Sequence, residues 1–273
     1  MKKLVFSALV FAAATASAQN KVLFAGSDTL GGMMTDAIIA AGMDSQIQYT
    51  GGGSGLAEKG LANGDQNIGP MSREIKPEVL NEMKARGLDV VPHVIGLDGI
   101  ALFVKASSPV QALDLPTVTR IFTCEITQWE QIPGSNLRGQ IRVVRRNDAS
   151  GTTDAFKHFT GLKNFGACVT VLNETADIAE ATARDGLTIG YAGLSGKLAD
   201  NRTLAIAKSA GAAPVLPNTT SIRNFSYPMA RNLYVYEVIG RELSQPEADL
   251  MSYVTDRSFM DPIVQSHEFI TID

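Results

Sequence analysis

Short apolar runs alternate with segments of helical periodicity along most of the chain. The apolar runs predict buried strands at residues 21–25, 46–50, 90–94, 99–104, 141–144, 188–191 and 233–238. Between them, apolar residues at helical spacing predict helices around residues 33–39, 56–63, 116–122, 154–159 and 247–256. This alternation is typical of an α/β fold whose helices pack on largely parallel sheets.

Glycine-rich loops occur both in the first third of the chain and in its middle. This distribution favours two lobes over one continuous sheet, and the chain is long enough for two ordinary domains. We expect one lobe to contain residues 19–99 together with 233–273. The other lobe is expected to contain residues 100–232.

The N-terminus has the pattern of an export signal. Two lysines precede an almost unbroken apolar run at residues 4–15, and Ala16-Ser17-Ala18 supplies the small residues of a cleavage site. The run is too short to span a bilayer, which argues against the alternative of an uncleaved anchor. We therefore predict a signal peptide at residues 1–18 and a mature periplasmic protein. Because Gln19 follows the cleavage site in place of a cysteine, no lipid anchor is expected, and no later stretch predicts membrane insertion.

The charge of the chain restricts the class of partner. The formal net charge is −4, and loss of Lys2 and Lys3 with the signal peptide makes it −6. Mild acidity argues against nucleic acid or an anionic membrane surface as a partner. It leaves a small anionic ligand open, because a buried site depends on local donors and not on the net charge.

Two cysteines, Cys124 and Cys168, are the only ones in the chain. In an oxidising compartment an isolated pair predicts a disulfide. Two free buried thiols remain the alternative, because sequence does not show whether the two residues meet. The three histidines are scattered without metal-ligand spacing, so neither a metal nor another cofactor is expected.

Three loops rich in glycine, serine and threonine each lie between a predicted strand and a predicted helix, at residues 26–29, 51–55 and 148–153. The first N–H groups of a helix are unpaired and carry partial positive charge, so an anion can bind to them. Glycine allows close approach, and serine and threonine add hydroxyl donors. Helix capping alone would explain any one of these loops. Three of them in one chain favour an anion site.

The third loop also follows two arginines. Arg145 and Arg146 directly precede Asn147 and Asp148. A guanidinium beside a helix start can hold two oxygens of an oxyanion, and an aspartate two residues further on can pair with that arginine. Solvated surface arginines remain the alternative.

Motifs for enzymes are missing from the sequence. Residues 51–60 lack the Gly-Lys-Ser/Thr of a phosphate-binding P-loop, and Leu56 stands where the dinucleotide-binding pattern requires glycine. No serine lies in a Gly-x-Ser-x-Gly turn. We therefore predict a binding protein and not an enzyme. A secreted phosphoester hydrolase remains an alternative, since a Ser/His/Asp set needs no local signature.

Residues 143–152 resemble the Arg-x-Asp-x-Ser-Gly-Thr loop of the phosphate-binding proteins that serve ABC-type phosphate importers. The order and spacing of further matches agree along almost the whole mature chain. These matches are residues 26–29, 51–55, 71–75, 97–101, 121–122, 126–129, 189–191, 227–228 and 231–236.

This resemblance implies a monomer with the two-lobed periplasmic binding protein fold, type II-like, that holds inorganic phosphate in the cleft between its lobes and delivers it to the permease subunits of an ABC transporter. It places Thr29 and Ser54 as donors from the first lobe, with Asp148 orienting Arg146 in the second. The full set of expected ligand-binding residues is Ser27, Asp28, Thr29, Ser54, Ser72, Arg146, Asp148, Ser150, Gly151 and Thr152.

One position departs from the family pattern. Some members carry, at the position of Ser72, an aspartate that accepts the proton of hydrogen phosphate, whereas here a serine is followed by Arg73. We hypothesise that Asp28 accepts this proton instead, with helix capping by Asp28 as the alternative. A receptor for sulfate or molybdate, and a secreted scavenging or adhesion protein, also remain open.

Overall fold

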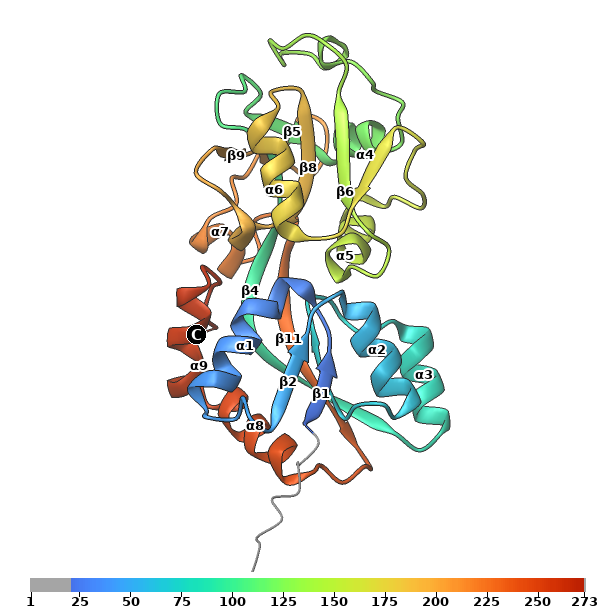
Figure 1. Cartoon of the computed structure of the whole chain (residues 1–273). Coiled ribbons are helices and arrows are strands. Elements are labelled where there is room, and N and C mark those ends of the chain that lie inside the picture. Colours follow the sequence, from blue (N-terminus) through green and yellow to red (C-terminus); the bar gives the residue numbers. More distant parts are fainter. Residues whose placement is uncertain (1–20, 273) are drawn as a thin grey trace, which may run out of the picture.

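Two long strands, β4 (Asp89–Lys105) and β11 (Ala230–Ile239), pass from one lobe of the molecule into the other and join them (Figure 1). They pair antiparallel along most of their length, from Ala230 opposite Gly99 to Ile239 opposite Asp89. The computed structural model describes residues 21–272. The predicted signal peptide at residues 1–18 lies outside the described residues.

The first lobe packs helices around β11, β4 and three short strands. β1 and β2 pair in parallel, and β3 pairs antiparallel with β11. The strands are β1 (Val22–Ala25), β2 (Ile47–Thr50) and β3 (Ile68–Met71), and the helices are α1 (Gly31–Ala40), α2 (Ser54–Asn63), α3 (Pro77–Ala85), α8 (Gln245–Thr255) and α9 (Arg257–Ser266), with a 3-10 turn η1 (Asp28–Leu30) before α1.

The second lobe is built on the other end of β4. β8 pairs antiparallel with β4 and parallel with β6, which pairs parallel with β7, while β9 pairs antiparallel with β4 and β5 pairs parallel with β10. These strands are β5 (Ala112–Asp114), β6 (Arg142–Arg146), β7 (Val169–Leu172), β8 (Thr188–Gly193), β9 (Asn201–Thr203) and β10 (Ala205–Ala207). The helical segments are α4 (Leu115–Phe122), η2 (Trp129–Gln131), α5 (Gly151–Thr160), α6 (Thr175–Arg184), η3 (Leu194–Gly196) and α7 (Thr219–Arg223).

The α/β fold is confirmed, but the expectation of largely parallel sheets is wrong. β4 is antiparallel to each of its partners β11, β8 and β9. The sequence also predicts two strands at 90–94 and 99–104 where β4 is one continuous strand. Gly96 to Gly99 have the composition of a turn, yet Asp98 stays inside the strand because its carboxylate is paired with Arg231 on β11.

Each lobe has its own hydrophobic core. In the first lobe Phe24, Met33 and Leu233 are buried in one cluster. In the second lobe the ring of Phe156 stacks on Tyr191 with centroids 3.9 Å apart, in a cluster that also buries Trp129. Two separate cores agree with a division into two lobes. The proposed boundaries at residues 99 and 232 fall inside the two connecting strands, and their placement stays a prediction.

No helix within residues 21–272 has the length and apolar character needed to cross a membrane.

The predicted disulfide is confirmed. Cys124, two residues after α4 ends, is bonded to Cys168, which directly precedes β7. The two Cα atoms lie 6.0 Å apart, and 44 positions of sequence separate them. Gly166 must be small here, because a Cβ at that position would collide with the sulfur of Cys124. The bond therefore fastens α4 to the edge strand of the second lobe.

Replacement of both cysteines by serine should lower the free energy of unfolding by about 4 kcal/mol, because the unfolded chain regains the entropy of an open loop. Chemical denaturation of the variant and of the wild type, each with and without reductant, measures this loss. The wild type should become less stable in reductant and the variant should not respond to it. Equal stability of the two proteins without reductant would contradict the prediction.

Candidate functional site

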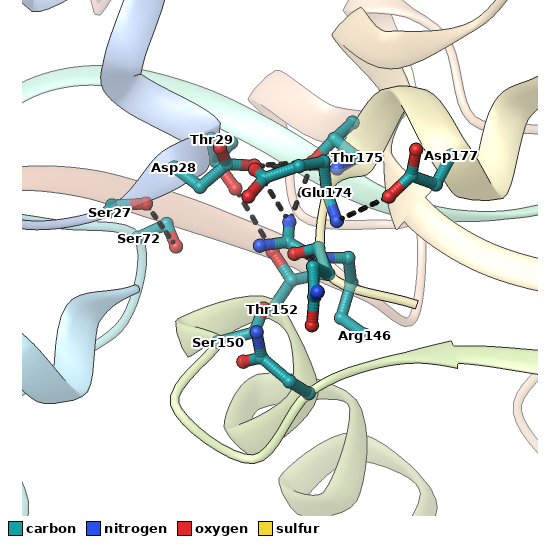
Figure 2. Close-up of polar contacts among 12 residues, drawn as sticks. Ser27, Asp28, Thr29, Ser72, Arg146, Ser150, Thr152, Glu174, Thr175 and Asp177 are labelled. Atoms are coloured by element: carbon teal, nitrogen blue, oxygen red, sulfur yellow. Dashed lines mark hydrogen bonds and ion pairs between the residues drawn. The ribbon is translucent and has the colours of Figure 1, made fainter. Parts of the chain in front are cut away.

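The three glycine-containing loops predicted from the sequence meet where the two lobes face each other. Figure 2 shows residues of the first and third of these loops, Ser27 to Thr29 and Ser150 with Thr152. The amide of Gly55 donates to the carbonyl of Ala149, with 3.2 Å between nitrogen and oxygen, so the second and third loops are in direct contact. A Cβ at Gly53 would collide with the same carbonyl oxygen, and Gly53 also has a φ of +127°. Glycine is required at this position for both reasons.

Three buried serines of the first lobe form a cluster of hydroxyl groups. Ser27 Oγ donates to Ser72 Oγ at 2.9 Å, and Ser54 Oγ lies 3.4 Å from Ser72 Oγ. The backbone amide of Ser72 donates to Ser54 Oγ at 3.0 Å. Ser54 has accepted that bond, so its own hydroxyl proton is available to another acceptor. The cluster therefore presents hydroxyl donors at the lobe interface.

The N-terminus of α5 lies against this cluster. A Cβ at Gly151 would collide with Ser54 Oγ, which shows how closely the helix approaches the first lobe. Ser150 caps the helix by accepting from the amide of Thr153. Thr152 Oγ1 lies 3.0 Å from Thr29 Oγ1 of the first lobe. The first amides of α5 have no carbonyl of the helix to donate to, so they and the helix dipole favour an anion here.

Arg146 is buried at the end of β6 and crosses from the second lobe to the first (Figure 2). Its Nη1 donates to the carboxylate of Asp28 at 2.9 Å and to Thr175 Oγ1 at 2.8 Å, while its Nε donates to the carbonyl of Asn173 at 2.7 Å. Its Nη2 is buried and has no partner among the described residues. A buried charged donor without an acceptor is costly, so Nη2 is the group best suited to hold a ligand oxygen.

The predicted pairing of Asp148 with Arg146 is absent. Asp148 instead binds Arg145, at 2.8 Å and 3.1 Å, and its side chain is 69% exposed. Neighbouring residues of a strand point to opposite faces, so only one of the two arginines can point into the interface. Arg145 lies 4.4 Å above the ring of Phe165 on the other face. The carboxylate that orients Arg146 is Asp28, from the other lobe.

Asp28 also faces a second carboxyl group, that of Glu174 at the start of α6. Burial works to raise the pKa of Asp28. The hydrogen bond with Glu174, the charge of Arg146 and hydrogen bonds from Thr175 outweigh burial and hold this pKa below its ordinary value. The same hydrogen bond to Asp28, aided by burial and by the negative charge of Asp28, raises the pKa of Glu174 to about 7. Below about pH 7 a protonated Glu174 can therefore donate to the ionised carboxylate of Asp28 in the opposite lobe.

The contacts of Asp28 argue against the alternative that its carboxylate caps the helix of its own loop. The Asp28 carboxylate accepts hydrogen bonds from Arg146 and from the hydroxyl and amide of Thr175, and it lies within η1 and not before it. All of these donors, on Arg146 and Thr175, belong to the second lobe. Whether Asp28 accepts a proton from a ligand stays a prediction.

Sequence reasoning misses two sets of charged residues that connect the lobes or underlie the loops. Arg73 binds Glu58 of its own lobe at 2.6 Å and Asp154 of α5 at 2.9 Å. Arg231 and Asp98 form a buried ion pair at 2.7 Å. The sequence gives a signal only for Asp98 and Arg231, which are charged residues inside apolar strands, and even these two partners are distant along the chain.

An open pocket of about 500 Å³ adjoins the contact between Asp28 and Glu174. Thr29 and Thr175 also line it, so it leads from solvent to the first of the three loops. Within residues 21–272 no group of three or more His, Cys, Asp or Glu residues could hold a metal ion. The groups gathered by the loops are hydroxyls, helix-start amides and a guanidinium, which together suit a small oxyanion.

Comparison with known proteins places these features in a family. The model of the family described as PBP superfamily domain matches residues 12–255. The phosphate-binding protein PstS of Pseudomonas aeruginosa is 28% identical over 257 residues, which cover 88% of this chain and 80% of the relative. Alkaline phosphatase L of the same species is 31% identical over only 130 residues, which cover 41% of this chain and 33% of the relative.

A solved structure has the same two-lobed architecture. It is a phosphate ABC transporter substrate-binding protein from Clostridium perfringens with bound phosphate, 26% identical to this chain with a TM-score of 0.78. The match covers 93% of this chain and 100% of the other. Since the family model spans well over half of the sequence, the chain belongs to the family of PBP superfamily domains.

Proposed function

We propose that this protein is an extracytoplasmic receptor that binds inorganic phosphate and delivers it to the permease subunits of an ABC transporter, without enzymatic activity. The observation that carries the proposal is the buried Nη2 of Arg146, which has no partner among the described residues, while Nη1 of the same guanidinium binds Asp28 of the first loop. The relatives named for phosphate binding over most of this chain support the choice of ligand. The predicted signal peptide and the absence of a lipidation cysteine support a free periplasmic protein.

Binding is coupled to closure of the lobes, because each lobe supplies part of the donor set. Ser27, Ser54 and Ser72 belong to the first lobe, and Arg146 and the start of α5 belong to the second. A ligand that contacts both lobes binds the closed form more tightly than the open form, and this difference drives the hinge. Ion pairs between the lobes, Arg146 with Asp28 and Arg73 with Asp154, assist closure.

A second candidate function is hydrolysis of a phosphoester, which the partial similarity to alkaline phosphatase L favours. Hydrolysis would need a nucleophile or a metal activated for attack. Incubation of purified protein with a chromogenic phosphomonoester separates the two functions. Stoichiometric phosphate binding without turnover supports the receptor, and steady release of the chromophore supports the hydrolase.

Arg146→Ala should weaken phosphate binding by about 10- to 150-fold, since a hydrogen bond from a charged group contributes about 1.5–3 kcal/mol. Titration calorimetry on protein stripped of ligand measures the affinity. The matched control is Arg145→Ala, one position earlier, whose guanidinium binds Asp148 at the surface. Arg145→Ala should keep wild-type affinity. Near wild-type affinity in Arg146→Ala would remove Arg146 from the site.

Asp28→Asn should reduce the preference for phosphate over sulfate, if Asp28 accepts the ligand proton that sulfate lacks. Calorimetry with phosphate, sulfate and molybdate on the wild type and the variant measures this preference. Asp148→Asn is the control, because its carboxylate is exposed and bound to Arg145. An unchanged ratio of phosphate to sulfate affinity in Asp28→Asn would show that the acceptor hypothesis is wrong.

The hydrogen bond between Glu174 and Asp28 predicts a pH dependence of closure. The pKa of Glu174 is raised to about 7 when Asp28 faces it, whereas in an open form the two groups are apart and Glu174 titrates near its ordinary value. The closed form therefore binds the proton more tightly. The extra stability that this proton gives the closed form over the open form is fully present below the ordinary pKa of Glu174. It is lost as the pH rises through about 7.

Glu174→Gln should flatten this part of the pH profile, because the amide donates to Asp28 at every pH. Phosphate affinity measured from pH 5 to pH 8 in the wild type and the variant gives the comparison, and the titration of phosphate itself cancels between them. Glu180→Gln, on the exposed face of the same helix, should follow the wild type. Parallel profiles of Glu174→Gln and the wild type would show that Glu174 does not control closure.

A further inference from the structure

A buried ion pair lies beneath the three loops, where the connecting strands pass between the lobes. Arg231 on β11 and Asp98 on β4 are directly opposite each other, and their side chains are 4% and 2% exposed. Arg231 Nη2 lies 2.7 Å and Nε 3.1 Å from the same carboxylate oxygen, Oδ2. The other oxygen of Asp98 accepts the amide of Leu194 at 3.1 Å. The two bonds to Asp98 thus fix the plane of the Arg231 guanidinium.

The remaining nitrogen of this guanidinium reaches both halves of the candidate site. Arg231 Nη1 donates to the carbonyl of Ser72 at 3.2 Å and to Thr152 Oγ1 at 3.0 Å. Ser72 belongs to the hydroxyl cluster of the first lobe, and Thr152 belongs to the first turn of α5 in the second lobe. A side chain at Gly193 would displace this arrangement, since its Cβ would lie 2.7 Å from the Asp98 carboxylate.

The chemistry of arginine sets the direction of the bond to Thr152. A guanidinium has no acceptor, so the oxygen of Thr152 accepts and the hydroxyl proton of Thr152 must point away from Arg231. The other polar neighbour of this hydroxyl is Thr29 Oγ1, at 3.0 Å, on the first loop. Either threonine can donate to the other. Thr29 can therefore donate to the remaining lone pair of Thr152 and leave the Thr152 proton for a ligand where the loops meet.

We propose that Arg231 is a positioning residue for the bound oxyanion, which acts through Thr152 and does not contact the ligand itself. It holds the hydroxyl of Thr152 as a donor that faces the ligand, and Asp98 holds Arg231 in place. The inference rests on the proposed function, because it needs an oxyanion between the lobes. A buried ion pair contributes little to stability compared with apolar residues, so stability alone gives no reason for this geometry.

A double-mutant cycle tests whether Arg231 acts through the hydroxyl of Thr152. The variants are Arg231→Lys, Thr152→Val and the double variant, and the measurement is calorimetry with inorganic phosphate. Lysine keeps the charge but lacks the planar fork that joins Asp98 to Thr152, and valine keeps the shape of threonine without its hydroxyl. Each single variant should bind about tenfold more weakly than the wild type. The double variant should bind no more weakly than Thr152→Val.

Losses that multiply in the double variant would overturn the proposal, because Arg231 would then act on the ligand directly or through the fold alone. Arg241→Lys is the matched control, since Arg241 donates to backbone carbonyls of Leu61 and Gln66 and should keep wild-type affinity. If Arg231→Lys does not fold, as thermal melts will show, Asp98→Asn replaces it in the same cycle with the same expectation.

The result also separates this inference from the proposed function. A wild type that binds sulfate or molybdate in place of phosphate contradicts the proposed ligand, and the cycle is then run with the anion that binds. A wild type that binds no oxyanion overturns both. Phosphate binding with multiplicative losses overturns only the role of Arg231.

Discussion

The burial of the Arg146 guanidinium between the lobes is the constraint on which the rest of the site depends. A buried cation must be paired, and here its partner Asp28 comes from the opposite lobe. The pairing uses Nη1, and Nε is bound to the carbonyl of Asn173, so Nη2 alone stays available to a ligand. The closed arrangement therefore leaves the buried Nη2 of Arg146 without an acceptor among the described residues. An oxyanion would supply the missing acceptor and join both lobes at once.

The connecting strands link the lobes and also carry two charged residues of the hydrogen-bonded network at the candidate site. β4 carries Asp98 and β11 carries Arg231 at the point where both strands pass from one lobe to the other. The guanidinium of Arg231 contacts Ser72 on one side and Thr152 on the other. A rotation of the lobes about these strands must change at least one of the two contacts. The hinge and the candidate site are therefore parts of one hydrogen-bonded network.

The sequence predicts the local parts of this site and not the distant pairings. Glycine, serine and threonine before a helix have the same meaning wherever the loop lies, so residues 26–29, 51–55 and 148–153 could be found from the chain alone. The partner of Arg146 could not, because the nearer Asp148 has the spacing of a partner and only the strand's alternation turns it toward Arg145. The pairing of Asp98 with Arg231 depends on the register of two strands, and 133 positions of sequence separate the two residues. The charge of Asp98 interrupts the apolar pattern of β4, so the sequence predicts two strands where there is one.

Groups of fixed polarity decide the direction of the hydrogen bonds in the site. Serine and threonine hydroxyls donate or accept as their neighbours require, whereas arginine only donates and an ionised carboxylate only accepts. Arg231 makes the Thr152 oxygen an acceptor, and the backbone amide of Ser72 does the same for Ser54. Each of these hydroxyl protons points away from its fixed donor, toward the neighbouring hydroxyl or a ligand. A set of donors arranged in this way holds any tetrahedral oxyanion, so discrimination between a protonated and an unprotonated one must come from an acceptor. Asp28, kept ionised beside Arg146, is the carboxylate among the predicted ligand residues that stands at the meeting point of the lobes.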